Sequence, residues 1–336
     1  MATSQLNVLD VYYLTLTLLI TIAYQLIGFS LAFSFKFDKL TDLMGGTNFA
    51  LLAILTLALS STNNHTPSPR QTLASICMII WSLRLSGFLL FRILKTGKDD
   101  RFDDKRDKFF PFLGFWVFQM LWVWTGSLGV TVLNSPAVQQ YPQPRLGASD
   151  IIGLVMFLVG FVLEAVADVQ KYRFRADAAN KGMTCTVGLF RWSRHPNYFG
   201  EMLVQFGIWL VTVGPTAYGS VARGSGAAAA QVAAIVGPCL LATLLLFVSG
   251  ITLQERPGGK KKFEADGPDG PAWRQWKDWT ERTSILLPMP SAVWTRLPRI
   301  VKTTVGFEWP IYQFVPEKHA DMDKVRSRQR EEAEQS

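Results

Sequence analysis

The sequence has few of the residues from which disulfide frameworks and metal cages are built. It contains three cysteines and three histidines in 336 residues, and they are scattered along the chain. An odd number of widely spaced cysteines predicts neither a disulfide framework nor a zinc site. The separation of the histidines gives no basis for a metal site either, and we expect no bound metal.

The signatures of soluble nucleotide-binding domains are also missing. No G-x-G-x-x-G motif follows a strand pattern, and no G-x-x-x-x-G-K-[ST] motif occurs. The N-terminus has no basic region, and the first apolar run is too long for the core of a secretory signal. We therefore expect no cleavable signal, and we interpret the first apolar run as a retained membrane span.

Long apolar runs are what the sequence does have. Hydrophobic residues make up 49% of it, and a span needs roughly 20 mostly apolar residues. This composition predicts an all-α integral membrane protein with a bundle of about seven transmembrane helices and a C-terminal tail. The candidate spans are residues 11–33, 43–59, 73–94, 110–133, 151–169, 196–213 and 227–253.

The basic residues alternate between the predicted loops. One set of connections holds only Arg70, Arg145 and Arg223, whereas the other set and the tail are rich in lysine and arginine. Basic loops face the cytosol, so the pattern predicts a lumenal N-terminus and a cytosolic C-terminus. The net charge of +8 is explained by membrane topology, and no nucleic-acid partner is expected.

Polar residues gather where the last three spans reach the cytosol. Ionisable groups in spans are expensive, so each is a candidate for function. Pro196 favours a helix start, whose free N–H groups, with two neighbouring basic residues, would form an anion site. The candidates for cofactor binding are Glu164, Asp168, Arg175, Arg194, His195, Asn197, Tyr198, Glu201 and Glu255.

Each candidate also has a plain structural explanation. The arginines would serve as anchors for lipid headgroups, Glu164 and Asp168 as partners of neighbouring bases, and His195 as a helix cap. Their predicted convergence instead suits a soluble anionic cofactor from the cytosol, with carboxylates on its ribose and arginines on its phosphates. An apolar substrate would arrive from the bilayer.

Residues 188–201, which read GLFRWSRHPNYFGE, resemble the signature of the steroid 5-alpha-reductase C-terminal superfamily. Within it, the chain is similar to a multi-span branch of undefined function, through residues 81–87, 100–103, 118–119, 249–251 and 283–288. The resemblance covers roughly residues 35–290. It sets residues 1–34 apart as a first transmembrane helix and residues 291–336 as a cytosolic, partly disordered extension.

The resemblance implies a bundle in the endoplasmic reticulum that uses NADPH to reduce a C=C bond in a steroid, sterol or other lipid. Asp168, Arg175, Asn197, Tyr198 and Glu201 match cofactor-binding positions of the superfamily. Arg194 and His195 match some members only.

The resemblance fails at the substrate half of the pattern. Steroid reductases polarise a ketone with an N-terminal glutamate and a tyrosine, but no glutamate precedes Glu164. Their histidine-rich turn is replaced by residues 253–256, which read LQER. A 3-oxosteroid substrate is therefore not expected. The proton donor would be Tyr198 or Tyr24, the one tyrosine in the middle of an early span.

Two other functions fit the same residues. Membrane carboxyl-methyltransferases that use S-adenosylmethionine carry a similar Arg-His-Pro-x-Tyr-x-Gly block and a later glutamate, which Glu255 matches, whereas Glu201 after Gly200 follows the reductases. A non-catalytic lipid-binding or scaffolding protein that retains an inherited site is the third alternative.

Overall fold

The computed structural model describes residues 8–37, 39–61, 66–96, 107–322, 325 and 327. These residues form helices and connections without a strand, apart from one isolated bridge between Ser193 and Ser284. The motif at residues 100–103 lies outside the described residues, as do residues 328–336 of the predicted extension. The prediction of an all-α fold is confirmed for the described part.

Six helical segments in the described part are long and apolar enough to cross a membrane, which confirms the integral membrane class. They are α1 (Leu14–Ser34), α2 (Leu40–Ser60), α3 (Pro69–Thr96), α4 (Phe109–Asn134), α6 (Ala148–Ala176) and the segment Gly226–Ala265. The predicted sixth span is α7 (Pro196–Thr212), which has 17 residues. At 1.5 Å per residue α7 measures about 26 Å, the lower limit for a span.

The chain divides into two compact units. The first comprises Met1–Val159 and Leu203–Leu241, and the second comprises Gly160–Met202 and Ala242–Ser336. The boundaries fall inside α6, α7 and α10 (Val236–Thr243), so three helices contribute residues to both units. The division at residues 34 and 290, taken from the extent of the resemblance, stays a prediction.

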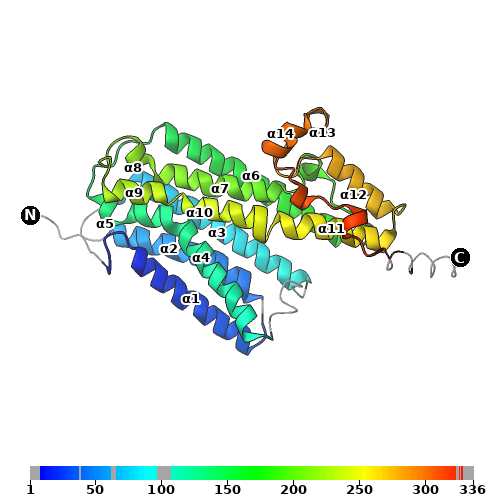
Figure 1. Cartoon of the computed structure of the whole chain (residues 1–336). Coiled ribbons are helices and arrows are strands. Elements are labelled where there is room, and N and C mark those ends of the chain that lie inside the picture. Colours follow the sequence, from blue (N-terminus) through cyan, green and yellow to red (C-terminus); the bar gives the residue numbers. More distant parts are fainter. Residues whose placement is uncertain are drawn as a thin grey trace, which may run out of the picture. The chain divides into compact units, whose positions relative to one another are not determined.

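In the first unit, α1, α2, α3 and α4 pack together (Figure 1), and a buried polar chain joins α1, α2 and α4. The Gln119 side-chain amide donates to Gln25 Oε1 at 2.8 Å, and the Gln25 amide donates to Asn48 Oδ1 at 3.1 Å. Because a bilayer offers no water to such groups, they must satisfy one another, which fixes the register of α1, α2 and α4. Tyr24 also lies here, with its hydroxyl 2.9 Å from Thr47 Oγ1.

A buried ion pair joins the starts of α3 and α6. Arg70 contacts Asp150 through two parallel bonds, Nε to Oδ1 at 2.7 Å and Nη2 to Oδ2 at 2.8 Å. The remaining guanidinium N–H groups donate to the carbonyl oxygens of Pro144 and Arg145. Both side chains are only 1% exposed. A buried ion pair of this kind is tolerated because the donors of Arg70 are hydrogen-bonded.

The second unit contains the ends of α6 and α7 and a set of short elements. A π-helical segment (Leu244–Val248) leads into α11 (Ile251–Asp266), and α12 (Pro271–Arg282) follows. Trp273, Trp276 and Trp279 recur every three residues on α12 and therefore share a face. The remaining helices are α5 (Pro136–Gln139), α8 (Gly214–Ala217) and α9 (Gly226–Ala233) of the first unit, and α13 (Ser291–Trp294), α14 (Arg299–Thr304) and α15 (Pro316–His319) of the second.

Replacing Asp150 by alanine should lower the free energy of unfolding by about 3–5 kcal/mol, because it leaves the buried Arg70 charge without its partner. Thermal unfolding of purified protein in detergent measures this. The control is Asp278→Ala, which breaks an exposed pair with Arg282 and should change stability by less than about 1 kcal/mol. Equal decreases in the free energy of unfolding for the two variants would show that the buried pair stabilises the fold no more than the exposed pair does.

Candidate functional site

The signature segment starts at a glycine that no other residue could replace without strain. Gly188 has a φ of 58°, and a Cβ placed there would lie 2.3 Å from the Gln170 side-chain oxygen. That oxygen accepts a hydrogen bond from the Leu189 backbone N–H at 2.9 Å. Glycine is therefore favoured by the left-handed backbone, and a larger residue would also displace the Gln170 side chain from this bond.

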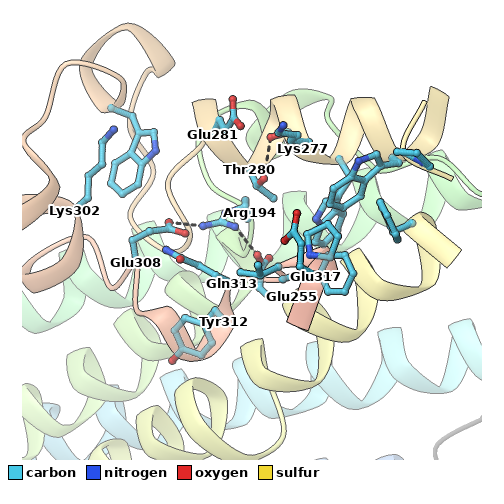
Figure 2. A pocket seen from close by; sticks show the side chains of 18 of the residues that line it. Arg194, Glu255, Lys277, Thr280, Glu281, Lys302, Glu308, Tyr312, Gln313 and Glu317 are labelled. Carbon is cyan, nitrogen blue, oxygen red and sulfur yellow. Dashed lines mark hydrogen bonds and ion pairs between the residues drawn. The ribbon is translucent and has the colours of Figure 1, made fainter. Parts of the chain in front are cut away.

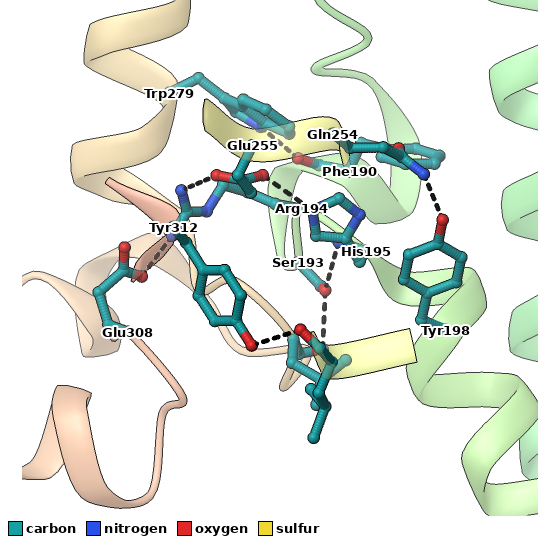
Figure 3. Close-up of polar contacts among 12 residues, drawn as sticks. Phe190, Ser193, Arg194, His195, Tyr198, Gln254, Glu255, Trp279, Glu308 and Tyr312 are labelled. Carbon is teal, nitrogen blue, oxygen red and sulfur yellow. Dashed lines mark hydrogen bonds and ion pairs between the residues drawn. The ribbon is translucent and has the colours of Figure 1, made fainter. Parts of the chain in front are cut away.

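Two of the motifs that carry the resemblance lie side by side. The Arg194 backbone N–H donates to the Ser284 carbonyl at 2.8 Å, and the Ser193 hydroxyl donates to the Leu286 carbonyl at 2.7 Å. The same hydroxyl accepts from the His195 N–H at 3.1 Å, immediately before α7 (Figure 3). Residues 283–288 thus hold the start of α7 in place.

A helical irregularity sets the direction of α11. At Gly250 a Cβ would lie 2.1 Å from the Leu245 carbonyl oxygen, so only glycine allows the π-helical segment to pass into α11. Within the π-helical segment, the Leu246 carbonyl accepts a hydrogen bond from the Tyr312 hydroxyl at 2.7 Å. The donor for this carbonyl thus comes from a residue far away in the sequence. Burial, together with the nearby Glu255 charge, raises the pKa of Tyr312 to about 12, which keeps this donor protonated.

Arg194 is the centre of the site. Its buried guanidinium pairs with Glu255, on the second turn of α11, and with Glu308, from the segment after α14 (Figure 3). Burial alone would lower the pKa of Arg194, but the two carboxylates reverse this and hold it above its ordinary value. Glu308 is positioned by Phe307, whose φ of 59° is rare for a non-glycine residue.

His195 extends the network to the other side of Glu255. Its Nε2 lies 2.8 Å from Glu255 Oε1, and its ring stacks on Tyr198 with centroids 5.2 Å apart. Gln254 donates to the Tyr198 hydroxyl and accepts from Lys171 Nζ at 3.1 Å. Burial lowers the pKa of His195 below its ordinary value even though its bond with Glu255 acts in the opposite direction, so the ring is neutral at physiological pH.

Of the predicted site residues, the structure brings Arg194, His195, Tyr198 and Glu255 into one network. With Gln254 and Glu308 they form what we call the Arg194 cluster. The other candidates of the second unit lie on α6 and α7: Glu164 is buried, Asp168, Asn197 and Glu201 are half-buried, and Arg175 is exposed. Tyr24 belongs to the first unit. The functional roles of all these residues stay predictions.

A cavity of about 960 Å³ opens beside the Arg194 cluster (Figure 2). α11, α12 and the segment after α13 surround it. Its aromatic lining residues are Phe263, Trp273, Trp276, Trp294, Tyr312 and Phe314, and its charged ones are Arg194, Glu255, Lys277, Glu281, Lys302, Glu308 and Glu317.

The sequence reasoning missed most of this cavity. It placed candidates only up to Glu255 and treated residues 291–336 as an extension, whereas Glu308 and Tyr312 come from that stretch. The tryptophan spacing on α12 and the aromatic run from Phe307 to Phe314 are the signals that could have indicated a folded, functional segment.

Several buried polar atoms next to the start of α7 have no hydrogen-bond partner among the described residues. Within the described part of the chain, Arg194 Nε, His195 Nδ1 and Asn197 Oδ1 are buried without a hydrogen-bond partner. Buried polar groups normally have partners, so three orphaned atoms within four residues make this a candidate binding position. No group of three potential metal ligands occurs among the residues that the structure describes.

Fold and site together define an all-helical integral membrane protein with a charged, aromatic cavity in its second unit. The chain belongs to the family described as "Protein of unknown function (DUF1295)", which matches residues 28–277. The matched range includes α12 as far as Lys277 and ends before Glu308 and Tyr312.

Two curated proteins are similar to short parts of the chain. An uncharacterized protein of Schizosaccharomyces pombe is 37% identical over 83 residues, covering 19% of this chain and 24% of that protein. A probable O-methyltransferase of Ustilaginoidea virens is 37% identical over 62 residues, covering 18% of this chain and 22% of that protein. Each match thus spans less than a quarter of the relative's length. No solved structure matches significantly.

The site predicts a pH dependence of stability. The ordinary pKa of histidine is about 6.5. As the pH falls below this value, His195 binds a proton in the unfolded chain, but in the folded protein it stays neutral to a lower pH because its pKa is lowered. The stabilisation from neutral His195 is therefore complete above about pH 6.5 and is lost as the pH falls towards the lowered pKa. Between about pH 7.5 and 5.5, the melting temperature of the wild type should fall more steeply than that of His195→Asn. His319→Asn, outside the cluster, is the control, and parallel curves for wild type and His195→Asn would refute the assignment.

Proposed function

We propose that this chain is a membrane-embedded methyltransferase that binds S-adenosylmethionine in the cavity beside Arg194 and methylates an oxygen atom of an apolar substrate. The observation that carries the proposal is the lining of the cavity, where aromatic walls surround an excess of carboxylates.

The charge of the lining favours a cationic ligand. Among the described residues, three cations and four carboxylates line the cavity. The cation at its centre, Arg194, is already shared by Glu255 and Glu308. A dinucleotide such as NADPH carries several phosphate charges and needs an excess of cations around it. S-adenosylmethionine carries a net positive charge and a sulfonium, which carboxylates and aromatic faces attract.

The size and the polar atoms of the cavity also fit this cofactor. A volume of about 960 Å³ lies within the usual range of small-molecule sites. Trp276 offers a large aromatic surface for adenine or the sulfonium. The unpartnered Arg194 Nε is a donor for the carboxylate of the amino-acid moiety.

In the proposed reaction, S-adenosylmethionine supplies an electrophilic methyl group. The chain's residues bind, orient and exclude water. Arg194 and His195 bind both oxygens of Glu255 and so hold this side chain in a fixed position beside the ligand. The molecule that remains after methyl transfer, S-adenosylhomocysteine, would have no net charge. The carboxylates of the cavity would attract it less, which favours its release.

Two further observations support methyl transfer. The methyltransferase interpretation of the sequence singled out Arg194, His195 and Glu255, and Glu255 contacts the other two. The Ustilaginoidea virens relative is described as a probable O-methyltransferase, although the similarity covers a short part of both chains.

An NADPH-dependent reductase of a lipid C=C bond is the second candidate. It is supported by the resemblance of residues 188–201 to the steroid-reductase signature, and by Lys277 and Lys302, which line the cavity and are suitable phosphate ligands. Tyr198, whose hydroxyl accepts from Gln254, would then be the proton donor. For either reaction we retain the orientation that follows from the basic loops, with the cavity on the cytosolic side of the endoplasmic reticulum membrane.

Isothermal titration calorimetry on purified protein in detergent separates the candidates. We expect saturable binding of S-adenosylmethionine and much weaker binding of NADPH. Trp276→Leu should weaken binding of S-adenosylmethionine about tenfold, because it removes the aromatic face from the cation. Trp192→Leu, outside the cavity, is the matched control and should leave the affinity unchanged.

The opposite results have defined meanings. Saturation by NADPH with no binding of S-adenosylmethionine would replace the proposal by the reductase. Failure of both to bind, in protein that unfolds cooperatively, would favour a non-catalytic lipid-binding protein.

A further inference from the structure

The second unit exposes a group of large apolar side chains. Ile300 is 70% exposed, Val305 59%, Val293 50% and Trp192 49%. They come from α13, α14, the turn after α14 and the residue that follows the 3-10 turn Gly188–Arg191. Scattered exposed apolar residues are common, but a group of this size on neighbouring elements marks a contact surface.

Hydrogen bonds hold these elements together. The Met289 backbone N–H donates to the Trp192 carbonyl at 3.0 Å, two residues before α13. The Ser291 hydroxyl, at the start of α13, donates to the Arg191 carbonyl at 3.4 Å. Downstream, Lys302 of α14 lies over the Trp294 ring at 5.3 Å. These contacts tie Trp192 to the chain that enters α13, and α14 to the end of α13. We call the four exposed side chains Trp192, Val293, Ile300 and Val305 the Trp192 patch.

The charge around the Trp192 patch has a single sign. Arg296 and Arg299 are exposed beside its apolar residues, and no acidic residue occurs between Thr283 and Phe307. An apolar surface with basic neighbours and an exposed tryptophan has the composition of segments that lie in the headgroup layer of a membrane. The tryptophan ring is suited to the interface, and arginines attract anionic headgroups.

The patch is also tied to a point where the chain approaches the bilayer. Trp192 lies four residues before Pro196, the first residue of the apolar helix α7. In the same unit, the last turn of the membrane-length helix α6 carries Arg173 and Arg175, which mark the level of the headgroups.

We propose that the Trp192 patch is a membrane-surface contact that docks on anionic lipid headgroups. A second copy of the chain fits less well, because pairing two such patches would bring like charges together. The contact does not depend on the identity of the cofactor. Docking of the patch would also hold the cavity wall in place. α14 contributes Lys302 to that wall, and the chain that follows α14 contributes Glu308.

A fluorescent label at Ile300 tests the docking. In a Cys239→Ser background, which removes the exposed cysteine and leaves the two buried ones, Ile300→Cys is labelled with a polarity-sensitive dye. The protein is then placed in nanodiscs of phosphatidylcholine and phosphatidylserine. We expect blue-shifted emission and strong quenching by lipid spin-labelled near the headgroup. The label at Asp269→Cys, a side chain 92% exposed, should emit as in water and escape quenching.

Varying the lipid charge and placing the label at a second position test the proposal further. Replacing both Arg296 and Arg299 by serine should reduce quenching at position 300 several-fold, as should nanodiscs without phosphatidylserine. Val305→Cys should behave like Ile300→Cys. Water-like, unquenched emission at both positions would overturn the proposal, and disulfide crosslinking of Ile300→Cys between two copies would replace it by self-association.

Discussion

One buried guanidinium joins the parts of the second unit. Arg194 precedes α7, Glu255 lies on α11, and Glu308 follows α14, yet their side chains meet at the wall of the cavity, with those of Arg194 and Glu255 almost fully buried. Removing a charge from water costs several kcal/mol, and the attraction between partners offsets this only when the donors are bound, whereas Arg194 Nε has no partner in the described part of the chain. We therefore view the Arg194 cluster as a device that selects one arrangement of these segments, more than as a source of net stability.

Local backbone features make this meeting possible. Gly188 and Gly250 occupy positions where any side chain would collide with a neighbouring segment, and the left-handed backbone at Phe307 directs the chain into Glu308. The Tyr312 hydroxyl satisfies a carbonyl of the π-helical segment. Irregular backbone of this kind is often found at functional sites, where it aims side chains that a regular helix would point elsewhere.

The sequence predicted the fold better than the site, for physical reasons. Apolar runs and basic loops are local signals, so the membrane class and the positions of the long helices could be found. The convergence of Arg194, His195 and Glu255 followed from the alternation of helix direction. Glu308 and Tyr312 could not be found this way, because their partners lie 114 and 66 residues away and no periodicity links them. The close contact of residues 193–194 with residues 284–286 was not predictable from spacing either.

The same features connect the fold to the proposed chemistry. The sequence suggested an anion site around Arg194. Because Arg194 is shared between two carboxylates and four carboxylates line the cavity, we propose a cationic cofactor instead. The segment that supplies Glu308 also supplies Lys302 to the cavity and three of the four residues of the Trp192 patch. Bilayer, cavity and ion-pair cluster are thus joined through residues 289–316.

Hydrogen–deuterium exchange of the full-length protein in nanodiscs tests most directly whether Arg194 holds this segment closed. Glu308→Gln keeps the shape of the side chain but removes its charge. The account predicts faster exchange of backbone amides in residues 299–316 of this variant, with α1 and α2 unchanged. Equal protection of residues 299–316 in Glu308→Gln and the wild type would contradict it.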